Sequence, residues 1–571
     1  MPLDLSHADT RWHVRKIGVV GPGIVGMPMA ALLARARVTE GSDTPAPVTV
    51  VQRASPTSAW KVEAINAGRS PIGGVEPGLD DVVAKAAAAG LLRATHDTSE
   101  LKDADVVLVC VQTDKAGFAP DYGPMFEALH QVAEALRRKP AGNVPLVVFE
   151  STLAPSSMAT VMRDHFACHG LQEGRDVLLG NSPNRVMPGR LVERVESSDK
   201  IVAGLHPATP GLIQRLYRRI VTRGSLHPTN SMAAEVVKTL ENAYRDVRIA
   251  FAAEVVRFCD VSDVDFFALR DEVNCRLAQT DAASSNPTAV PSGGLLVPTV
   301  GVGGHCLPKD GILLWWRALE AGLATGRSLI LEARHVNDAS PAETVALAER
   351  RLGDLAGRRV ALLGAAYRFD SEDTRNSPTL VLARLLADKG CAVKIHDPYV
   401  KSDDQNLLRF GLADRFTGDL ESALADAQVA FVCAAHQVYV DAPGDLARLG
   451  RKLEGVLDGC NAFRRESFTG APFGYTGIGR GRQSPPPALV DAVFDSFRAV
   501  EKGVANEVQT LLEFLNERYA RDDFNRARFA VVQKLAATCG TGCAVVDPGP
   551  IESVPSFGDF SSRLVRAATA A

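Results

Sequence analysis

Residues able to form a covalent bond to a substrate occur close together in one stretch of the sequence. Residues 301–310 read GVGGHCLPKD and contain one cysteine, Cys306, and one aspartate, Asp310. Glycines allow the backbone to turn with positive φ. Because they have no side chain, a substrate carbon can approach the thiol closely. A helix that begins here places Asp310, four residues on, at the same pocket. This arrangement is typical of nucleophilic catalysis, but a glycine turn around a buried cysteine fits the same residues.

A second pair of polar residues lies on a predicted long helix at residues 230–259. Apolar residues recur there every three or four positions, and Asn230 or Ser231 can cap its start. Lys238 and Asn242 are four residues apart and therefore share one face of this helix. Their ammonium and amide groups could together stabilise a negative charge that develops on oxygen. By spacing alone, a solvated lysine beside a surface asparagine is the commoner arrangement.

The N-terminal part contains the pattern of a dinucleotide-binding turn. A predicted strand at residues 16–20 runs directly into GPGIVG, and a predicted helix follows at residues 27–36. In this strand–turn–helix context the glycines let a pyrophosphate approach the helix N-terminus, where free N–H groups and the helix dipole favour an anion. The turn residues predicted to bind the cofactor are Gly21, Gly23, Ile24, Val25 and Gly26.

The next predicted strand, residues 48–51, should end in an acidic residue that bonds the adenosine ribose, yet Gln52 and Arg53 stand there. Arg53 could meet the 2′-phosphate of NADP. Alternatively, neither side chain touches the cofactor because the following segment shifts the strand end. We predict NAD, with NADP as the alternative. Two threonines at the carboxyl edge of the same predicted sheet complete the cofactor set: Thr113 and Thr152.

The composition of the chain excludes several classes of function. With 571 residues, of which 46% are apolar and 23% charged, two or three domains with sizeable cores are expected. A net charge of −4 and a pI near 6.3 argue against nucleic acid or an anionic membrane as the partner. No apolar run approaches the roughly 20 residues of a membrane helix, and the N-terminus lacks a secretory pattern. The ten cysteines are scattered without metal-ligand spacing, which predicts a cytoplasmic protein with reduced thiols and no metal site.

In their order along the chain, these motifs resemble those of the UDP-glucose/GDP-mannose (nucleotide-sugar) 6-dehydrogenase family. The resemblance covers residues 14–482 and includes NAGRSPI at residue 66, EST at residue 150 and EVVKTLENAY at residue 235. GAAYR at residue 364, followed by DTRNSP, is similar to the signature of the family's second domain. So many motifs in one order are highly specific for this family.

The resemblance implies an α/β fold with two Rossmann-like doubly wound domains joined by a long central helix, plus a C-terminal helical extension. The predicted divisions are an NAD-binding domain at 1–225, a central helical region with the catalytic cysteine at 226–340, a UDP-sugar-binding α/β domain at 341–482, and the extension at 483–571. In the extension, apolar residues step by three or four from Val493 to Tyr519, which predicts an amphipathic helix. A surface loop or lid is predicted at 279–298, and no pattern is found at 546–571. A homodimer through the central helix is also implied.

The chemistry implied is the oxidation of a sugar C6 alcohol to an acid in two steps, each passing a hydride to a nicotinamide. Between the two steps, the Cys306 thiolate would add to the aldehyde as a thiohemiacetal, and the second oxidation would give a thioester that water hydrolyses. Lys238 and Asn242 would stabilise the negative charge on the sugar oxygen. Asp310 would accept protons and help activate water, and Thr152 would help position that water.

The residues implied to contact the nucleotide sugar include departures from the family pattern. Asn184 stands where a glutamate is usual and cannot accept a proton, while Arg368 replaces a lysine with a cation of different geometry. Cys460 replaces an arginine, so a cation that binds uridine or phosphate is missing. Arg276 would come from a neighbouring subunit, and for every arginine a surface ion pair is the alternative. The predicted set is Asn184, Arg185, Val186, Lys238, Asn242, Arg276, Gly303, Gly304, Tyr367, Arg368 and Arg375.

The identity of the sugar rests on a few positions. His305, Pro308 and the segment RVMPG at 185–189 resemble the branch that acts on UDP-N-acetylhexosamines, whereas Lys309 resembles the UDP-glucose branch. We therefore predict a UDP-N-acetylhexosamine-like substrate, with UDP-glucose as the alternative. Because of Asn184, oxidation that stops at the aldehyde is a second alternative. A nucleotide-sugar binding protein with weakened turnover is the third, and the joint presence of all the catalytic residues argues against it.

Overall fold

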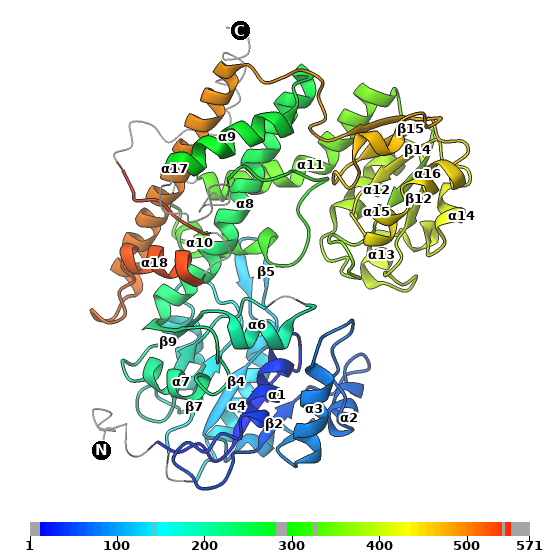
Figure 1. Ribbon diagram of the computed structural model, residues 1–571. Coiled ribbons are helices and arrows are strands. Elements are labelled where there is room, and N and C mark those ends of the chain that lie inside the picture. Colours follow the sequence, from blue (N-terminus) through cyan, green and yellow to red (C-terminus); the bar gives the residue numbers. More distant parts are fainter. Residues whose placement is uncertain are drawn as a thin grey trace. The chain divides into compact units, whose positions relative to one another are not determined.

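The computed structural model describes residues 12–140, 143–186, 188–280, 294–323, 328–539 and 543–549 (Figure 1). The predicted loop at 279–298 and the final segment at 546–571 therefore lie largely outside the described residues. The chain forms two compact units. The first unit contains Met1–Glu241, Leu313–Leu323 and Val508–Thr541, and the second contains Asn242–Ile312, Ala324–Glu507 and Gly542–Ala571.

The first unit is built on an eight-stranded sheet with the order β10-β9-β8-β7-β4-β1-β2-β3. All neighbouring strands pair in parallel except β8 and β9, which are antiparallel. The strands are β1 Ile17–Val20, β2 Val48–Val51, β3 Leu92–Thr95, β4 Val106–Val109, β7 Leu146–Phe149, β8 Leu178–Asn181, β9 Lys200–Gly204 and β10 Leu226–Asn230. A small hairpin, β5 Asp114–Ala116 and β6 Ala119–Asp121, follows β4.

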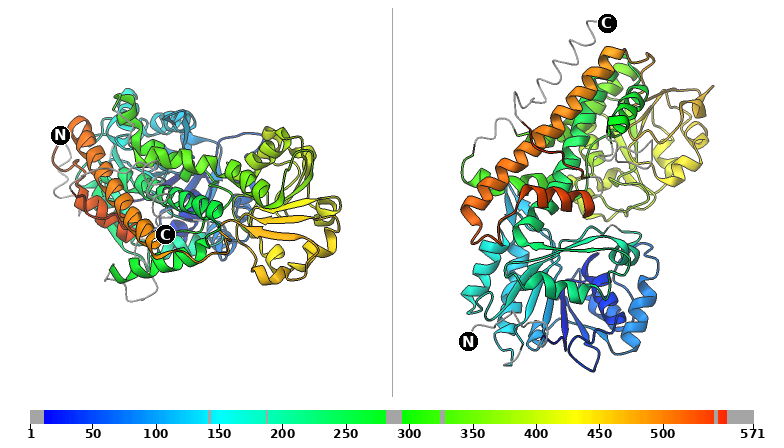
Figure 2. Two further views of the ribbon diagram at one scale, coloured as in Figure 1. Left: turned by 90° about the horizontal axis from the view of Figure 1, so that it is seen from above. Right: turned by 60° about the vertical axis from the view of Figure 1, so that its left-hand side comes forward.

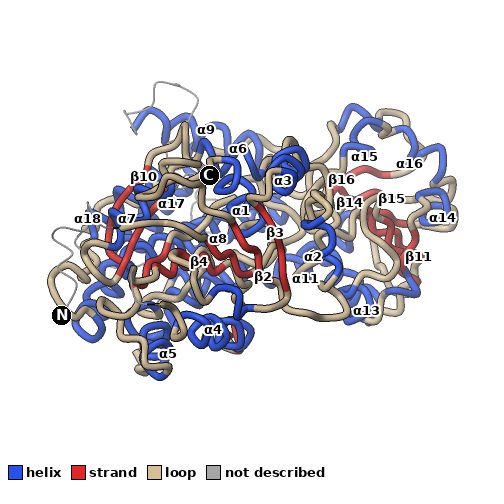
Figure 3. Tube along the Cα trace, turned by 90° about the horizontal axis from the view of Figure 1, so that it is seen from below, coloured by secondary structure: helices blue, strands red, loops and turns tan. Residues whose placement is uncertain are grey.

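Helices cover both faces of this sheet, and its central strands β1, β4 and β7 are accordingly apolar and buried at every position. Alternate residues of one strand enter different cores: Val106 and Leu108 lie in one, and Val107 and Val109 in the other. Helices α1, α3, α6 and α7 line the first core, and α4 and α5 the second (Figure 3). The helices are α1 Gly26–Arg35, α2 Trp60–Asn66, α3 Leu79–Ala88, α4 Gly123–Leu136, α5 Arg163–Cys168, α6 Leu191–Ser197 and α7 Thr209–Tyr217.

Long helices connect the two sheets along the chain. They are α8 Ser231–Ser262, α9 Phe266–Thr280, α10 Leu307–Glu320 and α11 Leu329–Leu352. The predicted cap of α8 is present, because the Asn230 side chain accepts a hydrogen bond from the N–H of Ala233 at 2.8 Å. The helix ends three residues beyond the predicted 259.

The second unit contains a six-stranded, fully parallel sheet with the order β13-β12-β11-β14-β15-β16. The order reverses between β11 and β14, so this sheet is also doubly wound. Its strands are β11 Arg359–Leu363, β12 Ala392–His396, β13 Phe416–Thr417, β14 Val429–Val432, β15 Gly455–Asp458 and β16 Gly474–Gly477. Its helices are α12 Pro378–Asp388, α13 Gln405–Phe410, α14 Leu420–Leu424, α15 Gln437–Asp441 and α16 Gly444–Leu449. The predicted fold class, two doubly wound α/β sheets with a long helix between them, is confirmed.

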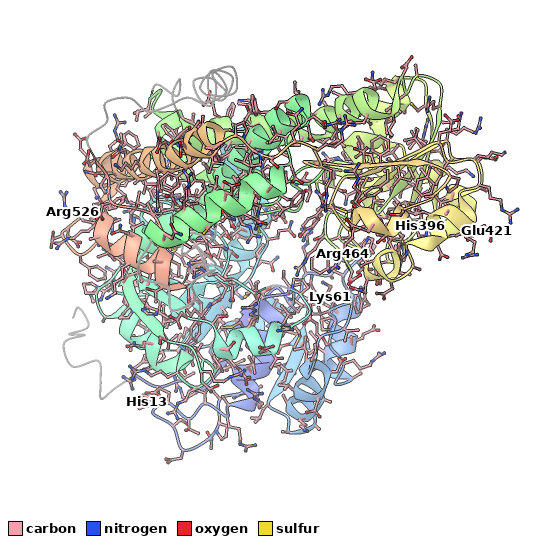
Figure 4. The ribbon with its side chains drawn as sticks, turned by 45° about the horizontal axis from the view of Figure 1, so that its top comes forward. His13, Lys61, His396, Glu421, Arg464 and Arg526 are labelled. Atoms are coloured by element: carbon pink, nitrogen blue, oxygen red, sulfur yellow. The ribbon has the colours of Figure 1, made fainter. Side chains whose placement is uncertain are left out.

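Two helices form the C-terminal extension, α17 Pro487–Tyr519 and α18 Phe529–Cys539 (Figure 2). The apolar face predicted for α17 is buried from Val493 to Leu515, which confirms the amphipathic helix. In the first unit, the Asn230 side chain donates to the backbone oxygen of Arg526, in the turn before α18, at 2.9 Å (Figure 4). Among the residues that the structure describes, no helix is both long and apolar enough to cross a membrane.

Candidate active site

The turn after β1 has the geometry of a phosphate cradle. Gly21 has φ of +92°, and a Cβ there would lie 2.8 Å from the backbone oxygen of Cys110. A Cβ on Gly26 would clash with the backbone oxygen of Gly21, so a side chain fits at neither position. A Cβ on Gly23 would meet nothing within 4 Å, so bare backbone faces open space at the start of α1. These residues fit a dinucleotide pyrophosphate at the helix N-terminus, with Ile24 and Val25 completing the turn.

The residues after β2 are held by local contacts. The Gln52 side chain donates to Ser58 Oγ at 3.0 Å. Arg53 forms an ion pair with Glu127 of α4 at 2.8 Å, and their side chains are 70% and 64% exposed. The cation considered for a 2′-phosphate therefore has a carboxylate partner, although such exposed pairs are weak.

Thr113 and Thr152 come together at the carboxyl ends of the neighbouring strands β4 and β7. The Thr113 hydroxyl donates to the backbone oxygen of Thr152 at 2.8 Å, and the Ser151 hydroxyl donates to the oxygen of Val111 at 2.5 Å. These bonds tie the two strand ends into one edge, which is where a doubly wound sheet binds ligands.

A buried carboxylate, Glu150, holds the loop that contains Asn184. Glu150 is 2% exposed and accepts hydrogen bonds from Lys200 Nζ at 2.8 Å, from the Tyr217 hydroxyl and from Asn184 Nδ2. Lys200 also donates to the backbone oxygen of Ser182 at 3.0 Å, and burial lowers the pKa of Lys200. Asn184 is thus a donor to a carboxylate, and its amide oxygen is the group left to accept a bond. The sequence interpretation did not assign a role to Glu150, Lys200 or Tyr217, because nothing in their spacing links them.

Arg185 is a buried cation with spare hydrogen-bond donors. Its Nε donates to Glu241 Oε2 at 2.6 Å, and the two side chains are 7% and 8% exposed. Both terminal nitrogens are buried and have no hydrogen-bond partner among the described residues. A buried guanidinium with unmade bonds is costly unless a ligand supplies acceptors. The next residue, Val186, packs against the core of the first unit.

Lys238 lies on α8 with its side chain buried, at 8% residue exposure. It makes no hydrogen bond or ion pair with any described residue. Most of the side chain is buried, but Nζ is not among the buried nitrogens that lack a partner, so the ammonium reaches solvent and is available to an oxygen of a ligand. Asn242 follows one helical turn later on the same face.

In the second unit, the cysteine turn is packed against the loop after β11. Gly304 has φ of +86°, and a Cβ there would lie 2.9 Å from Tyr367 Cζ. A Cβ on Gly303 would clash with the Tyr367 side chain, so the tyrosine needs both glycines. Gly304 also donates its N–H to the backbone oxygen of Arg375 at 2.8 Å and accepts from Asn376 Nδ2 at 2.9 Å. The turn is therefore held on both sides.

Cys306 is exposed and stands immediately before α10. Its backbone oxygen accepts the N–H of Asp310 at 2.9 Å, which is the first turn of that helix. A thiolate at a helix N-terminus is stabilised by the free N–H groups and by the positive end of the helix dipole. The position suits a nucleophile, and the alternative of a buried cysteine does not apply.

Asp310 is fully buried and both of its carboxylate oxygens are hydrogen-bonded. Asn242 Nδ2 donates to one oxygen at 2.6 Å, and Lys309 Nζ donates to the other at 2.5 Å. Lys309 is 3% exposed. The sequence interpretation used Lys309 only as a marker of the sugar branch and paired Asn242 with Lys238, so this contact with Asp310 was missed.

Tyr367 and Arg375 both lie within electrostatic range of Cys306. Burial raises the pKa of Tyr367, and the charges of Asp373 and Cys306 add to the rise. Arg375 donates to Asp373 at 2.9 Å and 2.6 Å, and this hydrogen bonding raises the pKa of Arg375. The charge of Cys306 contributes to that shift too.

Three more residues from the sequence analysis, Arg368, Arg276 and Cys460, contact other residues of the chain. Arg368 lies over the ring of Phe369 at 5.6 Å, and Arg276 of α9 forms an ion pair with Asp491 of α17. Cys460 is packed beside the buried Asp458, with Sγ 3.7 Å from a carboxylate oxygen. Burial, together with the charge of Asp458, raises the pKa of the Cys460 thiol.

A buried aspartate after β12 shapes the loop that carries Tyr367. One oxygen of Asp397 accepts the N–H groups of Ala365 and Ala366 at 2.8 Å and 2.9 Å. The same oxygen lies 3.0 Å from Nε2 of His436, whose Nδ1 accepts the N–H of Asp370 at 2.8 Å. Burial opposes ionisation of Asp397, but these bonds hold its pKa below the usual value. The preceding residue His396, labelled in Figure 4, contacts the Tyr439 hydroxyl at 2.7 Å.

Three family models match the chain. The NAD binding domain of the UDP-glucose/GDP-mannose dehydrogenase family matches residues 15–221, its central domain residues 232–339 and its UDP binding domain residues 361–465.

Several relatives match most of the chain. The UDP-N-acetyl-D-mannosamine dehydrogenase of Pyrococcus horikoshii is 29% identical over 82% of this chain and 99% of its own length. The NDP-N-acetyl-D-galactosaminuronic acid dehydrogenase of Ralstonia solanacearum is 32% identical over 74% of this chain and 92% of its own. The crystal structure of the latter enzyme from Methanosarcina mazei is 32% identical, covers 82% of this chain and 96% of its own, and has a TM-score of 0.68.

Proposed function

Because the chain belongs to the UDP-glucose/GDP-mannose dehydrogenase family, we propose that it oxidises the C6 alcohol of a UDP-linked N-acetylhexosamine to the carboxylate with NAD. It is a nicotinamide-dependent oxidoreductase that acts on nucleotide sugars; the particular sugar, the choice of NAD and the covalent route are the proposal. The observation that carries the proposal is the exposed thiol of Cys306 at the N-terminus of α10, with the buried carboxylate of Asp310 one turn on.

The sugar class is supported by the relatives and by local residues. Relatives named for N-acetylated mannosamine and galactosaminuronic acid match most of the chain. His305, Pro308 and the RVMPG segment at 185–189 agree with that branch. The buried, partly unbonded guanidinium of Arg185 would donate to the sugar or its acylamino group.

The glycine cradle at residues 21–26 fits a dinucleotide, and two nicotinamide cofactors that bind there one after the other would each accept one hydride. We favour NAD because Arg53, the cation considered for a 2′-phosphate, is already paired with Glu127. Thr113 and Thr152 would line the same edge of the sheet.

Cys306 acts between the two oxidations. The first oxidation removes a hydride from C6 and a proton from its hydroxyl, which leaves an aldehyde. The Cys306 thiolate then forms a C–S bond to the aldehyde carbon, and the electron pair of the carbonyl moves to oxygen. Loss of the second hydride from this thiohemiacetal gives a thioester. Water attacks the thioester carbon, the C–S bond breaks, and the thiolate leaves with the acid as product.

Lys238, Asn242 and Asp310 manage the charge and protons on the reacting oxygen. The partnerless ammonium of Lys238 would donate to the oxyanion. Asn242 already donates to Asp310, so it would orient that carboxylate as well as the substrate. Asp310, which accepts a hydrogen bond from Lys309, would accept the proton released when water attacks. Thr152 and the amide oxygen of Asn184 would position the water.

The UDP part would be held by the second sheet. The cysteine turn contacts the loop after β11 where Tyr367 packs on Gly303 and Gly304. Two arginines close to Tyr367 in the sequence, Arg368 and Arg375, are the proposed cations. Cys460 contributes no cation, so these two arginines are the ones proposed to bind the diphosphate.

The experiment is a stoichiometric assay with a panel of UDP-sugars. Two reduced cofactors per UDP-N-acetylhexosamine support the proposal, and turnover of UDP-glucose alone contradicts the sugar. One reduced cofactor per sugar, with an aldehyde trapped by hydroxylamine, would show oxidation that stops half-way. Binding of a UDP-sugar without any reduced cofactor would show a binding protein.

The covalent route is tested with Cys306→Ala. This variant should form no uronate, whereas Cys275→Ala, which removes another exposed thiol, should keep the full stoichiometry. Uronate formation at the original rate by Cys306→Ala would contradict the route. A cytoplasmic location and a homodimer remain predictions.

A further inference from the structure

The turn after β7 leads from Thr152 into a strained segment. Ser156 is fully buried and has φ of +76°, a left-handed conformation that costs free energy for a residue with a side chain. A π-helical turn, Met158–Met162, begins two residues later. Such geometry persists only where the surrounding groups hold it in place. Because Ser156 is four residues from Thr152, the groups that hold Ser156 also restrict the position of Thr152.

Two side chains of the first unit hold the backbone of this segment. The carboxyl group of Glu235 on α8 accepts the N–H of Ser156 at 2.9 Å and the N–H of Met158 at 2.8 Å. The Tyr122 hydroxyl, at the start of α4, accepts the N–H of Ala154 at 2.8 Å. These bonds fix the main chain of the turn, and the hydroxyl groups of the turn bond to a third side chain.

That third side chain is Arg317 on α10. Its Nε donates to Ser156 Oγ at 2.9 Å, and its Nη2 donates to Thr160 Oγ1 at 2.8 Å. Its Nη1 donates to Glu320 at 2.6 Å, so each nitrogen of the guanidinium has an acceptor. The planar fork of an arginine suits several acceptors at fixed positions, which a lysine ammonium would not match. Arg317 therefore joins the strained residue to the π-helical turn that follows it.

Two aromatic rings set the position of the Arg317 guanidinium. It lies over the ring of Trp316, its neighbour on α10, at 3.8 Å and over the ring of Tyr519, the last residue of α17, at 5.0 Å. The quadrupole of an aromatic face attracts a cation, and more strongly when the cation is removed from water. The Arg317 side chain is 12% exposed. Trp316 also packs against Ala154 inside the turn.

Tyr519 comes from the C-terminal extension. It lies beyond the last family-model match, which ends at residue 465. Residues Val508–Thr541 nevertheless belong to the same compact unit as the eight-stranded sheet. The extension thus brings a ring to the side chain that holds the turn after β7.

We propose that Arg317, seated on Tyr519 of the extension, is a positioning residue that holds Thr152 at the cofactor edge of the first sheet. Both residues act through the turn at 152–160 rather than on the reacting atoms. The inference rests on the role that the proposed function gives to Thr152, and it assigns the extension a part in cofactor binding.

The test is a double-mutant cycle between Arg317→Met and Thr152→Ala, with the dissociation constant of NADH measured from its fluorescence. Loss of the Thr152 hydroxyl removes one hydrogen bond and should weaken NADH binding about two- to tenfold. Because Arg317 acts through Thr152, Arg317→Met should weaken binding by no more than this, and the double variant should equal Thr152→Ala alone. Additive effects, or an unchanged constant in Arg317→Met, overturn the proposal. The measurement needs no sugar, so an absence of sugar turnover would contradict the proposed function and leave this test intact.

Variants of Tyr519 test the part of the extension. Tyr519→Leu removes the ring and should weaken NADH binding less than Arg317→Met does, whereas Tyr519→Phe keeps the ring and should bind NADH as the unchanged protein does. The control is Arg518→Met, which removes an exposed cation over the ring of Phe514 at 4.8 Å on the same helix and should leave the constant unchanged. Equal weakening by Tyr519→Leu and Arg518→Met would overturn the part of Tyr519. If circular dichroism shows that Arg317→Met does not fold, Tyr519→Leu takes its place in the cycle with Thr152→Ala.

Discussion

Lys309 and Asp310 are neighbours in the chain, and the ammonium of Lys309 donates to the buried carboxylate of Asp310 at 2.5 Å. The two side chains are 3% and 0% exposed. They lie in the first turn of α10, directly after Cys306. The residue proposed to move protons is therefore bonded through one oxygen to its own neighbour in the chain and through the other to Asn242.

Removal of Lys309 should destabilise the protein. Lys309→Met leaves Asp310 as a buried charge with one neutral donor, and loss of one partner of a buried pair costs about 3 kcal/mol or more. Urea unfolding followed by circular dichroism measures the change. The double variant Lys309→Met/Asp310→Asn has no buried charge and should regain much of the loss. An unfolding midpoint of Lys309→Met equal to that of the unchanged protein would refute this role.

Cofactor preference should respond to Glu127. Glu127→Gln frees Arg53 to meet a 2′-phosphate, so kcat/KM for NADP should rise relative to NAD. The exposed pair is worth at most about 1 kcal/mol, so the rise should be no more than about fivefold. Adding Arg53→Ala should abolish it.

The matched control for cofactor preference is Glu134→Gln on the same helix α4, whose carboxylate pairs with Arg137 at 2.9 Å. It should leave the ratio of NADP to NAD unchanged. An equal response in both glutamine variants would mean that Glu127 has no specific influence on the cofactor site.

Stability should fall as the pH rises through the neutral range, in part because of Glu235. Burial raises the pKa of Glu235 from 4.5 to about 8, although it accepts the N–H groups of Ser156 and Met158. Between these values the folded protein binds a proton that the unfolded chain has released, so the free energy of unfolding decreases with pH. One such proton contributes up to about 1.4 kcal/mol per pH unit.

Urea unfolding at pH values from 5 to 9 measures this slope. Glu235→Gln should show a smaller slope, because the titrating group is gone. Glu63→Gln removes an exposed carboxylate of α2 and should keep the original slope. Identical slopes in all three proteins would mean that Glu235 does not titrate as expected.

Asp397 should act on substrate binding through the loop that carries Tyr367. Asp397→Asn keeps one accepting oxygen where the carboxylate has two, so the N–H groups of either Ala365 and Ala366 or Tyr399 and Val400 lose their acceptor. Each buried donor left unbonded costs about 1–3 kcal/mol. We expect KM for the UDP-sugar to rise several-fold while KM for NAD is unchanged. Asp388→Asn, at an exposed position on α12, is the control. A loss of stability with both KM values unchanged would limit Asp397 to a structural role.

Much of the fold followed from local patterns in the sequence. Strand β2 has the predicted bounds, and β1 and α1 lie within one residue of theirs, because short apolar runs next to turn residues identify buried parallel strands. The glycine pattern identified the cradle after β1, since only glycine fits at Gly21 and Gly26. The apolar spacing identified α17. These signals are local, because backbone hydrogen bonding and side-chain periodicity act over a few residues.

The contacts between distant residues were decided only by the tertiary structure. Glu150 binds Asn184 and Lys200, which lie 34 and 50 residues away in the sequence. Tyr367 packs on Gly303 and Gly304, and nothing in the sequence of either motif indicates this contact. Whether α17 would pack on its own chain or on another subunit could not be read from its apolar face. Burial and charge pairing depend on which surfaces meet in three dimensions, and periodicity shows only that a surface needs a partner.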